Sequence, residues 1–360
     1  MDDASALFDI ALSLLFRNRL RKSLALIDHY GSAQEAWSHL HEPGMQDCLE
    51  RAAKELDWIN AHGIRVWTLA DADYPVRLRQ CPDKPLVLYG KGNIEPSEGH
   101  FVSIVGTRRP TERGKDLTRK LVHDLHERLE QLTIVSGGAY GIDIAAHRAA
   151  IEFGVPTLII TAHGLDRIYP FQHRRDAIAA LAQGGLLTEF PSETEPLPAY
   201  FLQRNRIIAG LSDVTVVVES RERGGSLVTA NMANDYNREL VTFPGRPDDL
   251  SSQGCNKLIQ NNKAHLISNA DDLIALMDWK TRDAVNQPVQ TTMVGLLGDF
   301  SPLQQTLLAK LQEADEGLHI NFLVMETGLP YDNIASELVM LELQGVVRSL
   351  PGGFYRFVQK

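Results

Sequence analysis

Residues 101–141 read FVSIVGTRRPTERGKDLTRKLVHDLHERLEQLTIVSGGAYG, and this stretch decides the fold. The β-branched and apolar run Phe101–Val105 predicts a strand that stops at Gly106. Leucines then recur every four residues, which predicts an amphipathic helix, at Leu117, Leu121, Leu125 and Leu129. A second strand follows over 133–136 and also stops at glycine. Two strands joined by such a helix form a right-handed parallel unit, whose ligands lie at the carboxyl ends of the strands.

The same alternation continues to about residue 279. Further strands are expected at 156–161, 186–190, 214–219, 240–243 and 264–267. Helices are expected at 113–130, 141–153, 172–183, 200–210, 226–236, 255–262 and 270–279. Seven strands alternating with helices predict an α/β fold with a Rossmann-like, doubly wound and mostly parallel sheet.

The flanks predict two smaller domains. Residues 1–70 contain short helices broken by glycine, as in a SAM or helix-hairpin-helix domain that grips DNA, but their negative charge favours a cap that only packs on the next domain. Strands at 64–69 and 86–89 are interpreted as a connection to the sheet, which belongs to a Rossmann-like domain over 71–280. Residues 281–298 are interpreted as a linker. Residues 299–360 predict a small C-terminal winged-helix domain, with helices at 319–327 and 331–344 and a hairpin after them.

Composition narrows the class of protein. The chain of 360 residues has three widely separated cysteines, begins without a signal-peptide pattern and contains no apolar run of the ~20 residues that a membrane span needs. We therefore expect a soluble cytoplasmic protein without a membrane partner. The net charge of −10 argues at first against nucleic acid, but charge over the whole molecule does not exclude a positive local cleft.

The first of four candidate turns is Gly106-Thr107-Arg108-Arg109-Pro110. Gly106 lets the backbone approach a ligand, and the forked guanidinium groups of Arg108 and Arg109 suit phosphate. The alternative is that both arginines are solvated loop charges. The G-x-G-x-x-G and Walker lysine motifs are absent from the sequence, so NAD and ATP lack their usual signatures.

The second turn contains Gly137 and Gly138, whose amides would point toward an anion at the start of the next helix. Asp143 follows in the first helical turn, where it could cap amides or hold an arginine. His147 has no nucleophile and carboxylate pattern around it, so a packed helix histidine is favoured over a catalytic one.

The third turn places His173, Arg174 and Arg175 near Tyr169 and Phe171. Arginines interleaved with aromatic rings suit a single strand, whose phosphates pair with guanidinium groups while its bases stack. The alternative is that the rings belong to the core, and Pro170 favours this for one of the two.

The fourth element is split between two helices. Phe201, Arg204 and Arg206 lie on the first; the two arginines are two residues apart and point in different directions, so at most one faces a ligand and the other forms a structural ion pair. In the second, Ser226 and Thr229 follow Gly225 in a capping arrangement that also offers hydroxyls and amides to a phosphate.

Taken together, these residues resemble a known family. The segments IVGTRRP, VSGGAYGIDIAAH, GLDRIYP, FLQRNRIIAGLSD, GGSLVTA and FPGRPDDLSSQGCNKLI occur in order and closely resemble the DNA-processing protein A family (DprA, also called Smf), most strongly over residues 70–270. The resemblance implies a cytoplasmic homodimer, not an enzyme, that binds and protects incoming single-stranded DNA. It also implies loading of RecA recombinase in natural transformation (competence) and DNA recombination.

The family's DNA pocket would correspond here to Gly106, Arg108, the Arg174 position, Arg204 and Arg206. The sequence departs from the family at His173-Arg174-Arg175, where Asn and Lys are usual, and at Gly224-Gly225-Ser226, where Ser-Gly-Ser is commoner. Neither change removes a positive or a small group, so we expect the pocket to keep its function.

The leading hypothesis is a DNA-binding protein without catalytic residues, metal or cofactor. Its candidate contacts are Gly106, Thr107, Arg108, Arg109, Gly137, Gly138, Phe171, His173, Arg174, Arg175, Phe201, Arg204, Arg206, Gly225, Ser226 and Thr229. One alternative is a nucleotide-handling enzyme such as a phosphoribohydrolase, but the turn at 224–229 has no following glutamate in register. Another is duplex binding by the tail, but 331–344 contains no Lys or Arg, which favours a protein-binding or packing role there.

Overall fold

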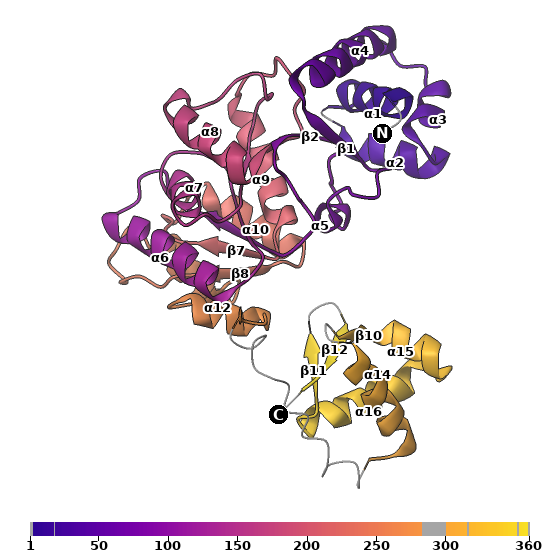
Figure 1. Cartoon of the computed structure of the whole chain (residues 1–360), viewed down its shortest axis with the longest axis vertical. Helices are drawn as coiled ribbons and strands as arrows, with labels where there is room; N and C mark the ends of the chain where they lie inside the picture. Colours follow the sequence, from indigo (N-terminus) through magenta and orange to yellow (C-terminus); the bar gives the residue numbers. More distant parts are fainter. Residues whose placement is uncertain (1–2, 18, 283–299, 315–316, 351–352, 359–360) are drawn as a thin grey trace. The chain divides into compact units, whose positions relative to one another are not determined.

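The computed structural model describes residues 3–17, 19–282, 300–314, 317–350 and 353–358, and two compact units divide the chain (Figure 1). The first unit is Met1–Gln287 and the second is Pro288–Lys360. Within the described ranges, no helix combines the length and the apolar character that crossing a membrane requires.

A nine-stranded sheet forms the centre of the first unit, in the order β1-β2-β6-β5-β4-β3-β7-β8-β9. The strands are β1 (Arg65–Thr68), β2 (Val87–Gly92), β3 (His100–Val105), β4 (Leu132–Ser136), β5 (Thr157–Ile160), β6 (Gly185–Thr188), β7 (Val214–Val217), β8 (Glu239–Thr242) and β9 (His265–Leu266). The seven strands β3 to β9 are parallel, which confirms the predicted sheet. Because the order reverses at β3, the turns after β3, β4 and β7 meet at one place on the sheet edge.

The interpretation of 64–92 as a mere connection was incomplete, because its two strands form an edge of the same sheet. β2 pairs antiparallel with β6, with Tyr89 opposite Thr188, and β1 pairs antiparallel with β2. A Cβ at Gly185 would lie 2.4 Å from the carbonyl oxygen of Lys91, so glycine allows this close pairing. The alternation of apolar and polar residues predicts that a segment forms a strand, but it does not predict which other strand it pairs with.

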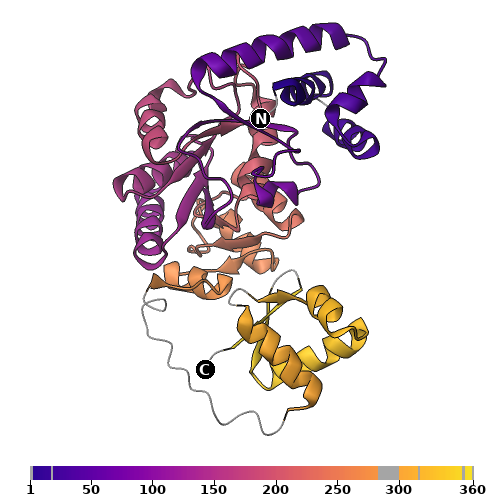
Figure 2. The same cartoon turned by 45° about the vertical axis from the view of Figure 1, so that its right-hand side comes forward.

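Helices cover both faces of the sheet, as the doubly wound fold predicts (Figure 2). One face carries α6 (Glu112–Arg128), α7 (Ile142–Glu152), α8 (Arg174–Gln183) and α12 (Ala270–Met277). The other carries α5 (Val76–Arg79), α9 (Pro198–Leu211), α10 (Ser226–Asp235) and α11 (Gln253–Gln260). Successive residues of β3 alternate between the two cores, since Ile104 faces the first and Phe101 the second.

Four amino-terminal helices pack against the β1–β2 edge of the sheet. They are α1 (Asp3–Leu15), α2 (Leu20–Tyr30), α3 (Ala33–Ser38) and α4 (Met45–His62). Ser32 caps α3, since its hydroxyl accepts a hydrogen bond from the amide of Glu35 at 3.1 Å. Trp37 of α3 shares one core with Val66 of β1 and Tyr89 of β2, so this cap is joined to the sheet by apolar packing.

The second unit is a winged helix, as predicted. It contains α14 (Pro302–Glu313), β10 (Leu318–His319), α15 (Ile320–Thr327), α16 (Tyr331–Leu343), β11 (Val347–Leu350) and β12 (Phe354–Phe357). Its sheet has the order β10-β12-β11, where β10 is a short strand that the sequence did not predict. The linker predicted over 281–298 lies almost entirely outside the described residues.

A paired arginine and aspartate fasten the starts of β3 and β7 to α5. Arg77 donates from Nε and Nη2 to the two oxygens of Asp213 at 2.6 and 2.9 Å, and Asp213 also accepts the amide of Phe101 at 2.8 Å. We expect Asp213→Ala to lower the free energy of unfolding by about 3 kcal/mol, because the substitution leaves a half-buried guanidinium without its carboxylate partner and the amide of Phe101 without its acceptor. Urea unfolding measures the loss. The matched control is Glu152→Ala, which breaks the exposed Arg119 pair and should cost less than about 0.5 kcal/mol; equal losses would contradict the prediction.

Asp9 of α1 is a buried carboxyl group that makes stability depend on pH. It is 5% exposed, and burial together with the nearby charge of Asp71 raises its pKa to about 7. The folded state therefore holds a proton on Asp9 that the unfolded state releases near pH 4, so the contribution of Asp9 to stability should fall as the pH rises from about 4 to about 7 and stay level above that. Asn carries no titrating proton, so we expect Asp9→Asn to gain stability relative to the unaltered protein by about 2 kcal/mol or more between pH 5 and pH 8. Urea unfolding of both proteins at the two pH values measures this gain; a stability difference between them that is the same at pH 5 and pH 8 would refute it.

Candidate functional site

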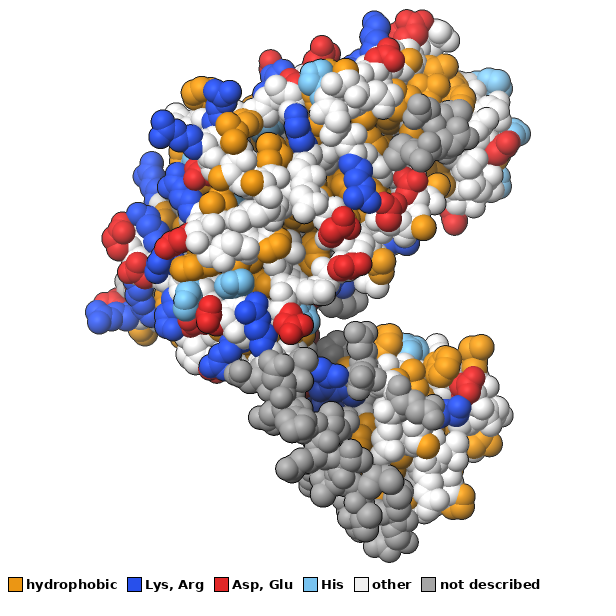
Figure 3. Space-filling view, viewed as in Figure 1, with side chains coloured by type: hydrophobic (Ala, Val, Ile, Leu, Met, Phe, Trp, Pro, Cys, Tyr) orange, Lys and Arg blue, Asp and Glu red, His pale blue; other side chains and the backbone are white. Residues whose placement is uncertain are grey.

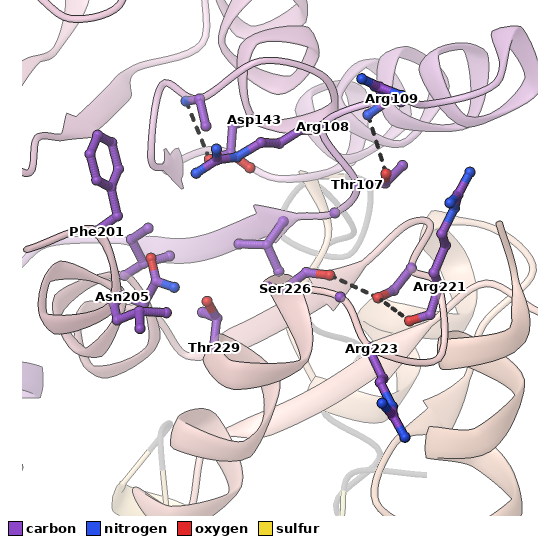
Figure 4. Close-up of a pocket in the computed structure, with 18 of the residues that line it drawn as sticks. Thr107, Arg108, Arg109, Asp143, Phe201, Asn205, Arg221, Arg223, Ser226 and Thr229 are labelled. Carbon is purple, nitrogen blue, oxygen red and sulfur yellow. Dashed lines mark hydrogen bonds between the residues drawn. The ribbon is translucent and has the colours of Figure 1, made fainter. Parts of the chain in front are cut away.

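A cleft of about 460 Å³ lies where the turns after β3, β4 and β7 meet the starts of α9 and α10 (Figure 4). Its lining is Val105, Gly106, Thr107, Arg108, Arg109, Ala139, Asp143, Phe201, Leu202, Arg204, Asn205, Ile208, Ser220, Arg221, Arg223, Gly224, Gly225, Ser226 and Thr229. The structure therefore brings together nine of the sixteen candidate contacts from three separate stretches of sequence.

The turn after β3 is fixed by packing and by two backbone hydrogen bonds. A Cβ at Gly106 would lie 2.5 Å from Cγ1 of Ile142, so only glycine lets this turn pack on the start of α7. The amide of Thr107 donates to the carbonyl oxygen of Glu219 at 2.8 Å, and the carbonyl oxygen of Thr107 accepts the amide of Ile142 at 3.2 Å. With its backbone held on both sides, the turn leaves Arg108 and Arg109 exposed at the cleft.

Glu219 is a buried carboxylate at the end of β7 that the sequence analysis did not single out. It accepts hydrogen bonds from the amide and the hydroxyl of Thr111, and that hydroxyl in turn accepts the amide of Gly114 at the start of α6. A Cβ at Gly114 would lie 2.5 Å from the Glu219 carboxyl carbon. Glu219 therefore joins α6 to β7 beneath the cleft. The sequence did contain a signal for Glu219, because this carboxylate directly follows the apolar run Val214–Val218.

Arg108 crosses the cleft toward Phe201 and Asp143 (Figure 4). Its guanidinium carbon lies 5.8 Å from the centre of the Phe201 ring, a cation–π geometry. Within the described part of the chain, Arg108 has no ion pair with a carboxylate. An exposed guanidinium beside a ring can pair with a phosphate and leave the ring face to a base.

Arg204 is buried in the wall of the cleft and only 3% exposed. Its Nη1 donates to the carbonyl oxygen of Ile160 at the end of β5, while its Nε is buried without a hydrogen-bond acceptor. A Cβ at Gly137 would lie 2.1 Å from Nη1, so Gly137 provides the space that this guanidinium fills. Gly137 thus acts through Arg204 and does not line the cleft, contrary to its predicted role as an anion-binding turn.

Arg204 and Asp143 are opposite charges buried near each other. Burial lowers the pKa of Arg204 to about 10, and Asp143 counteracts that effect. Burial likewise raises the pKa of Asp143, opposed by Arg204, by the backbone amides of Ala139 and Gly137 and by Arg108. Arg204 is still protonated at neutral pH.

The start of α10 differs from its prediction. Its cap position is Gly225, with no side-chain capping bond, and Ser226 donates instead from Oγ to Ser220 Oγ at 3.1 Å. Thr229 is buried and lines the cleft floor together with Ser226. The expected cap is wrong because Ser226 is the first residue of the helix, whereas a capping side chain belongs to the residue before it, which here is Gly225.

His173 and Gly138 lie outside the cleft and contact each other. His173 Nδ1 is 2.9 Å from the carbonyl oxygen of Gly138, and its ring is buried edge-on against Tyr140. These contacts connect the turn after β4 to the 3₁₀ turn before α8 (Phe171–His173). The structure therefore does not bring His173 and Gly138 together with the cleft residues, because the histidine side chain is used to hold two turns together.

Phe171, Arg174 and Arg175 are exposed but do not line the cleft. The expectation that either Tyr169 or Phe171 belongs to the core is wrong, since the rings are 52% and 71% exposed. Tyr169 packs edge-on to Phe201 with ring centres 5.9 Å apart, so it borders the cleft that Phe201 lines. The loop stays at the surface because the amide of Tyr169 is bound by the buried His163.

Arg206 is the structural arginine of the pair on α9. It is buried, forms an ion pair with Glu189 and donates to the carbonyl oxygen of Asp83. This confirms that one of the two arginines is used in an ion pair, and it removes Arg206 from the candidate contacts. His147 is also structural, as predicted: it is fully buried against Thr157 Oγ1, and burial followed by Arg204 lowers its pKa to about 3.

Two exposed arginines in the cleft, Arg221 and Arg223, were missing from the prediction. They follow the end of β7 just as Arg108 follows the end of β3, and this position was the signal that could have found them. In Figure 4 they lie across the cleft from Phe201.

Many other basic side chains lie over α6, α7 and α8, where the space-filling view shows Lys and Arg together with acidic groups (Figure 3). Several of these cations are paired: Arg119 with Glu152, Arg148 with Asp176 and Lys115 with Glu112. Arg174 and Arg175 at the start of α8 are exposed and have no ion pair among the described residues. Charge on that side is therefore compensated in part.

Comparison with known protein families shows which class of protein has this fold and this site: the family of DNA recombination mediators. The family described as DNA recombination-mediator protein A matches residues 65–278, and the family described as the DprA winged helix domain matches 296–353. The chain belongs to the DprA/Smf family.

Individual relatives and solved structures of the same family are also similar to this chain. The chain is 35% identical to protein Smf of Synechocystis sp. over 79% of this chain and 78% of the relative, and 32% identical to protein Smf of Escherichia coli over 80% and 76%. The crystal structure of DNA processing protein A from Streptococcus pneumoniae matches with a TM-score of 0.64 at 30% identity, covering 75% of this chain and 97% of that one. A structure describing the single-stranded DNA binding mode of the Helicobacter pylori protein matches with a TM-score of 0.53 at 31% identity, over 59% and 95%.

Gly137 and Gly225 make a matched pair of tests for the buried arginine. Gly137→Ala places a Cβ against Arg204, and we expect a loss of about 1–3 kcal/mol in the free energy of unfolding together with a distorted cleft. Gly225→Ala meets no atom within 4 Å at φ −63°, so its effect should stay within about 0.5 kcal/mol. Thermal unfolding compares the two; a neutral Gly137→Ala would show that Arg204 is not held as described.

Proposed function

We propose that the cleft binds the backbone of single-stranded DNA and that the protein acts in DNA processing during natural transformation and recombination. The observation that carries this proposal is the set of exposed cleft arginines without carboxylate partners in the described part of the chain, beside the ring of Phe201. Family membership and the single-stranded DNA binding mode described for the Helicobacter pylori relative support it.

Electrostatics favours an anionic ligand here despite the net charge of −10. Arg108, Arg109, Arg221 and Arg223 line the cleft, whereas its one carboxylate, Asp143, is buried beside Arg204. The exposed charge of the cleft is therefore positive. A phosphate that binds Arg108 replaces water and counterions, which predicts affinity that falls with salt.

A single strand fits better than a duplex because the cleft offers a ring to an unpaired base. Phe201 is partly exposed at the rim, with Tyr169 edge-on behind it. Stacking on such a ring requires a base that is not inside a helix, and it accepts any base. The site therefore favours single strands without strong sequence preference.

Binding without catalysis is part of the proposal. Of the cleft groups that could act as nucleophile or base, Ser226 donates its hydroxyl to Ser220, and Asp143 lies buried beside Arg204. His147 follows Asp143 on α7 and could be considered as a base, but it is fully buried and neutral at pH 7. These contacts support a binding site in preference to a nucleotide-cleaving one, which incubation with nucleoside monophosphates and a search for free base would reveal.

The finer parts of the proposal follow from the family resemblance. We infer that the protein works in the cytoplasm, protects incoming single strands, loads RecA recombinase onto them and forms a homodimer. For the winged helix we infer a role in protein contact, because α16 contains no Lys or Arg and exposes Val339, Met340 and Leu343. A helix with that surface lacks the cations that attract a duplex.

Two cleft variants separate the contributions of charge and stacking. Arg108→Gln should weaken binding to a single strand and reduce the slope of log affinity against log salt by about 0.7, the effect of losing one phosphate contact. Phe201→Ala should weaken binding about 5- to 100-fold with the slope unchanged, because stacking does not release counterions. Fluorescence anisotropy over a salt series measures both quantities.

The control is Arg119→Gln on α6, an exposed arginine outside the cleft that is paired with Glu152. It should leave affinity and slope unchanged. If the folded double variant Arg108→Gln, Phe201→Ala binds a single strand as tightly as the unaltered protein does, the proposed site is wrong.

A further inference from the structure

A second group of exposed arginines continues from the cleft along the sheet edge toward β8. Arg109 and Arg113 belong to the turn before α6 and to its first turn, Arg221 and Arg223 to the loop after β7, and Arg246 to the loop after β8. β3, β7 and β8 are neighbours with parallel pairing, so these three loops emerge side by side at the carboxyl edge.

We propose that a single strand longer than the cleft leaves it on the β7 side and runs over Arg221 and Arg223 to a second phosphate-binding site formed by Arg113 and Arg246. This inference rests on the proposed function, since it extends the strand that the cleft holds. It adds a surface that was not among the candidate contacts predicted from sequence.

Packing shows that the two sites are contiguous. Arg113 and Arg246 line a second cavity of about 790 Å³ together with Thr111, Pro244, Gly245, Asp248 and Asp249. Thr111 of this cavity is bonded to Glu219, which immediately precedes Ser220 and Arg221 of the cleft.

The loops after β7 and β8 are also held together by backbone contacts. The amide of Gly254 donates to the carbonyl oxygen of Ser220 at 2.8 Å, and a Cβ at Gly254 would lie 2.5 Å from the carbonyl oxygen of Arg221. A Cβ at Gly245 would lie 2.0 Å from Ser252 Oγ, so the loop after β8 is folded closely on the residues that lead into α11. These contacts make the two loops one continuous wall.

The arginines along this wall outnumber the carboxylates beside them. None of the five arginine side chains forms a salt bridge or a side-chain hydrogen bond with another described residue. Two carboxylates line the second cavity: Asp248 is exposed, and Asp249 accepts hydrogen bonds from Ser251 and Ser252, which together with the nearby charge of Arg113 lower its pKa. A third, Glu222, forms an ion pair with Lys257 at 2.7 Å. Over the whole wall positive charge therefore exceeds negative charge.

The test compares strand lengths, because a short strand fills only the cleft. Affinity and salt slope are measured by anisotropy for oligothymidylates of about 6 and about 20 nucleotides; the short length lies near the lower end of the usual site sizes and the long one exceeds them. For Arg113→Gln with Arg246→Gln we expect unchanged binding of the short strand, about 10-fold or greater weakening for the long strand, and a long-strand slope reduced by about 1.4, since two phosphate contacts are lost.

The matched control is Arg119→Gln with Arg148→Gln, two exposed arginines in ion pairs over α6 and α7, which should bind both strands as the unaltered protein does. Long-strand binding that is unchanged in the Arg113, Arg246 variant, or weakened no more than short-strand binding, overturns the second site and leaves the cleft proposal standing. Failure of the unaltered protein to bind either strand would instead overturn the proposed function. All four substitutions are at exposed positions, and thermal unfolding checks that each variant is folded.

Discussion

A buried guanidinium is the constraint on which the site depends. Arg204 reaches from α9 across the carboxyl ends of the strands to the carbonyl oxygen of Ile160. A charge at that depth needs a nearby opposite charge, which Asp143 at the start of α7 supplies, and space, which the absence of a side chain at Gly137 supplies. One helix on each face of the sheet is thereby fixed to the same point, and the relative placement of the turns follows from it.

This buried pair also explains the distribution of charge. Because Asp143 is buried beside Arg204, the carboxylate of the cleft adds little negative charge at its surface. Arg108, Arg221 and Arg223 then stand exposed over a nearly neutral floor. An acidic protein can in this way present a positive groove, whereas several of the cations over α6–α8 are compensated by carboxylates. Pairing with carboxylates, more than the number of arginines, determines how positive each surface is.

The turns of the cleft are rigid before any ligand arrives. Thr107 is bonded to Glu219 after the end of β7 and to the start of α7, and Glu219 holds the start of α6. The arginine side chains on these turns are exposed, and the backbone that carries them is held by hydrogen bonds within the fold. A preformed groove of this kind loses little conformational entropy when a ligand binds.

The sequence by itself determined the strands β3 to β9, the helices between them, the family and the first arginine turn, because hydrophobic period and glycine breaks are local signals. Only the tertiary structure decided which polar residues are consumed by the fold. His173 contacts Gly138, Arg206 pairs with Glu189, and Gly137 packs against Arg204, so these three predicted contacts are engaged within the fold and do not line the cleft. Arg221 and Arg223 line the cleft because their side chains are exposed and form no ion pair with another described residue. Which strands become neighbours, and whether a charge finds a partner, depends on residues far apart in the chain, and spacing along a sequence does not contain that information.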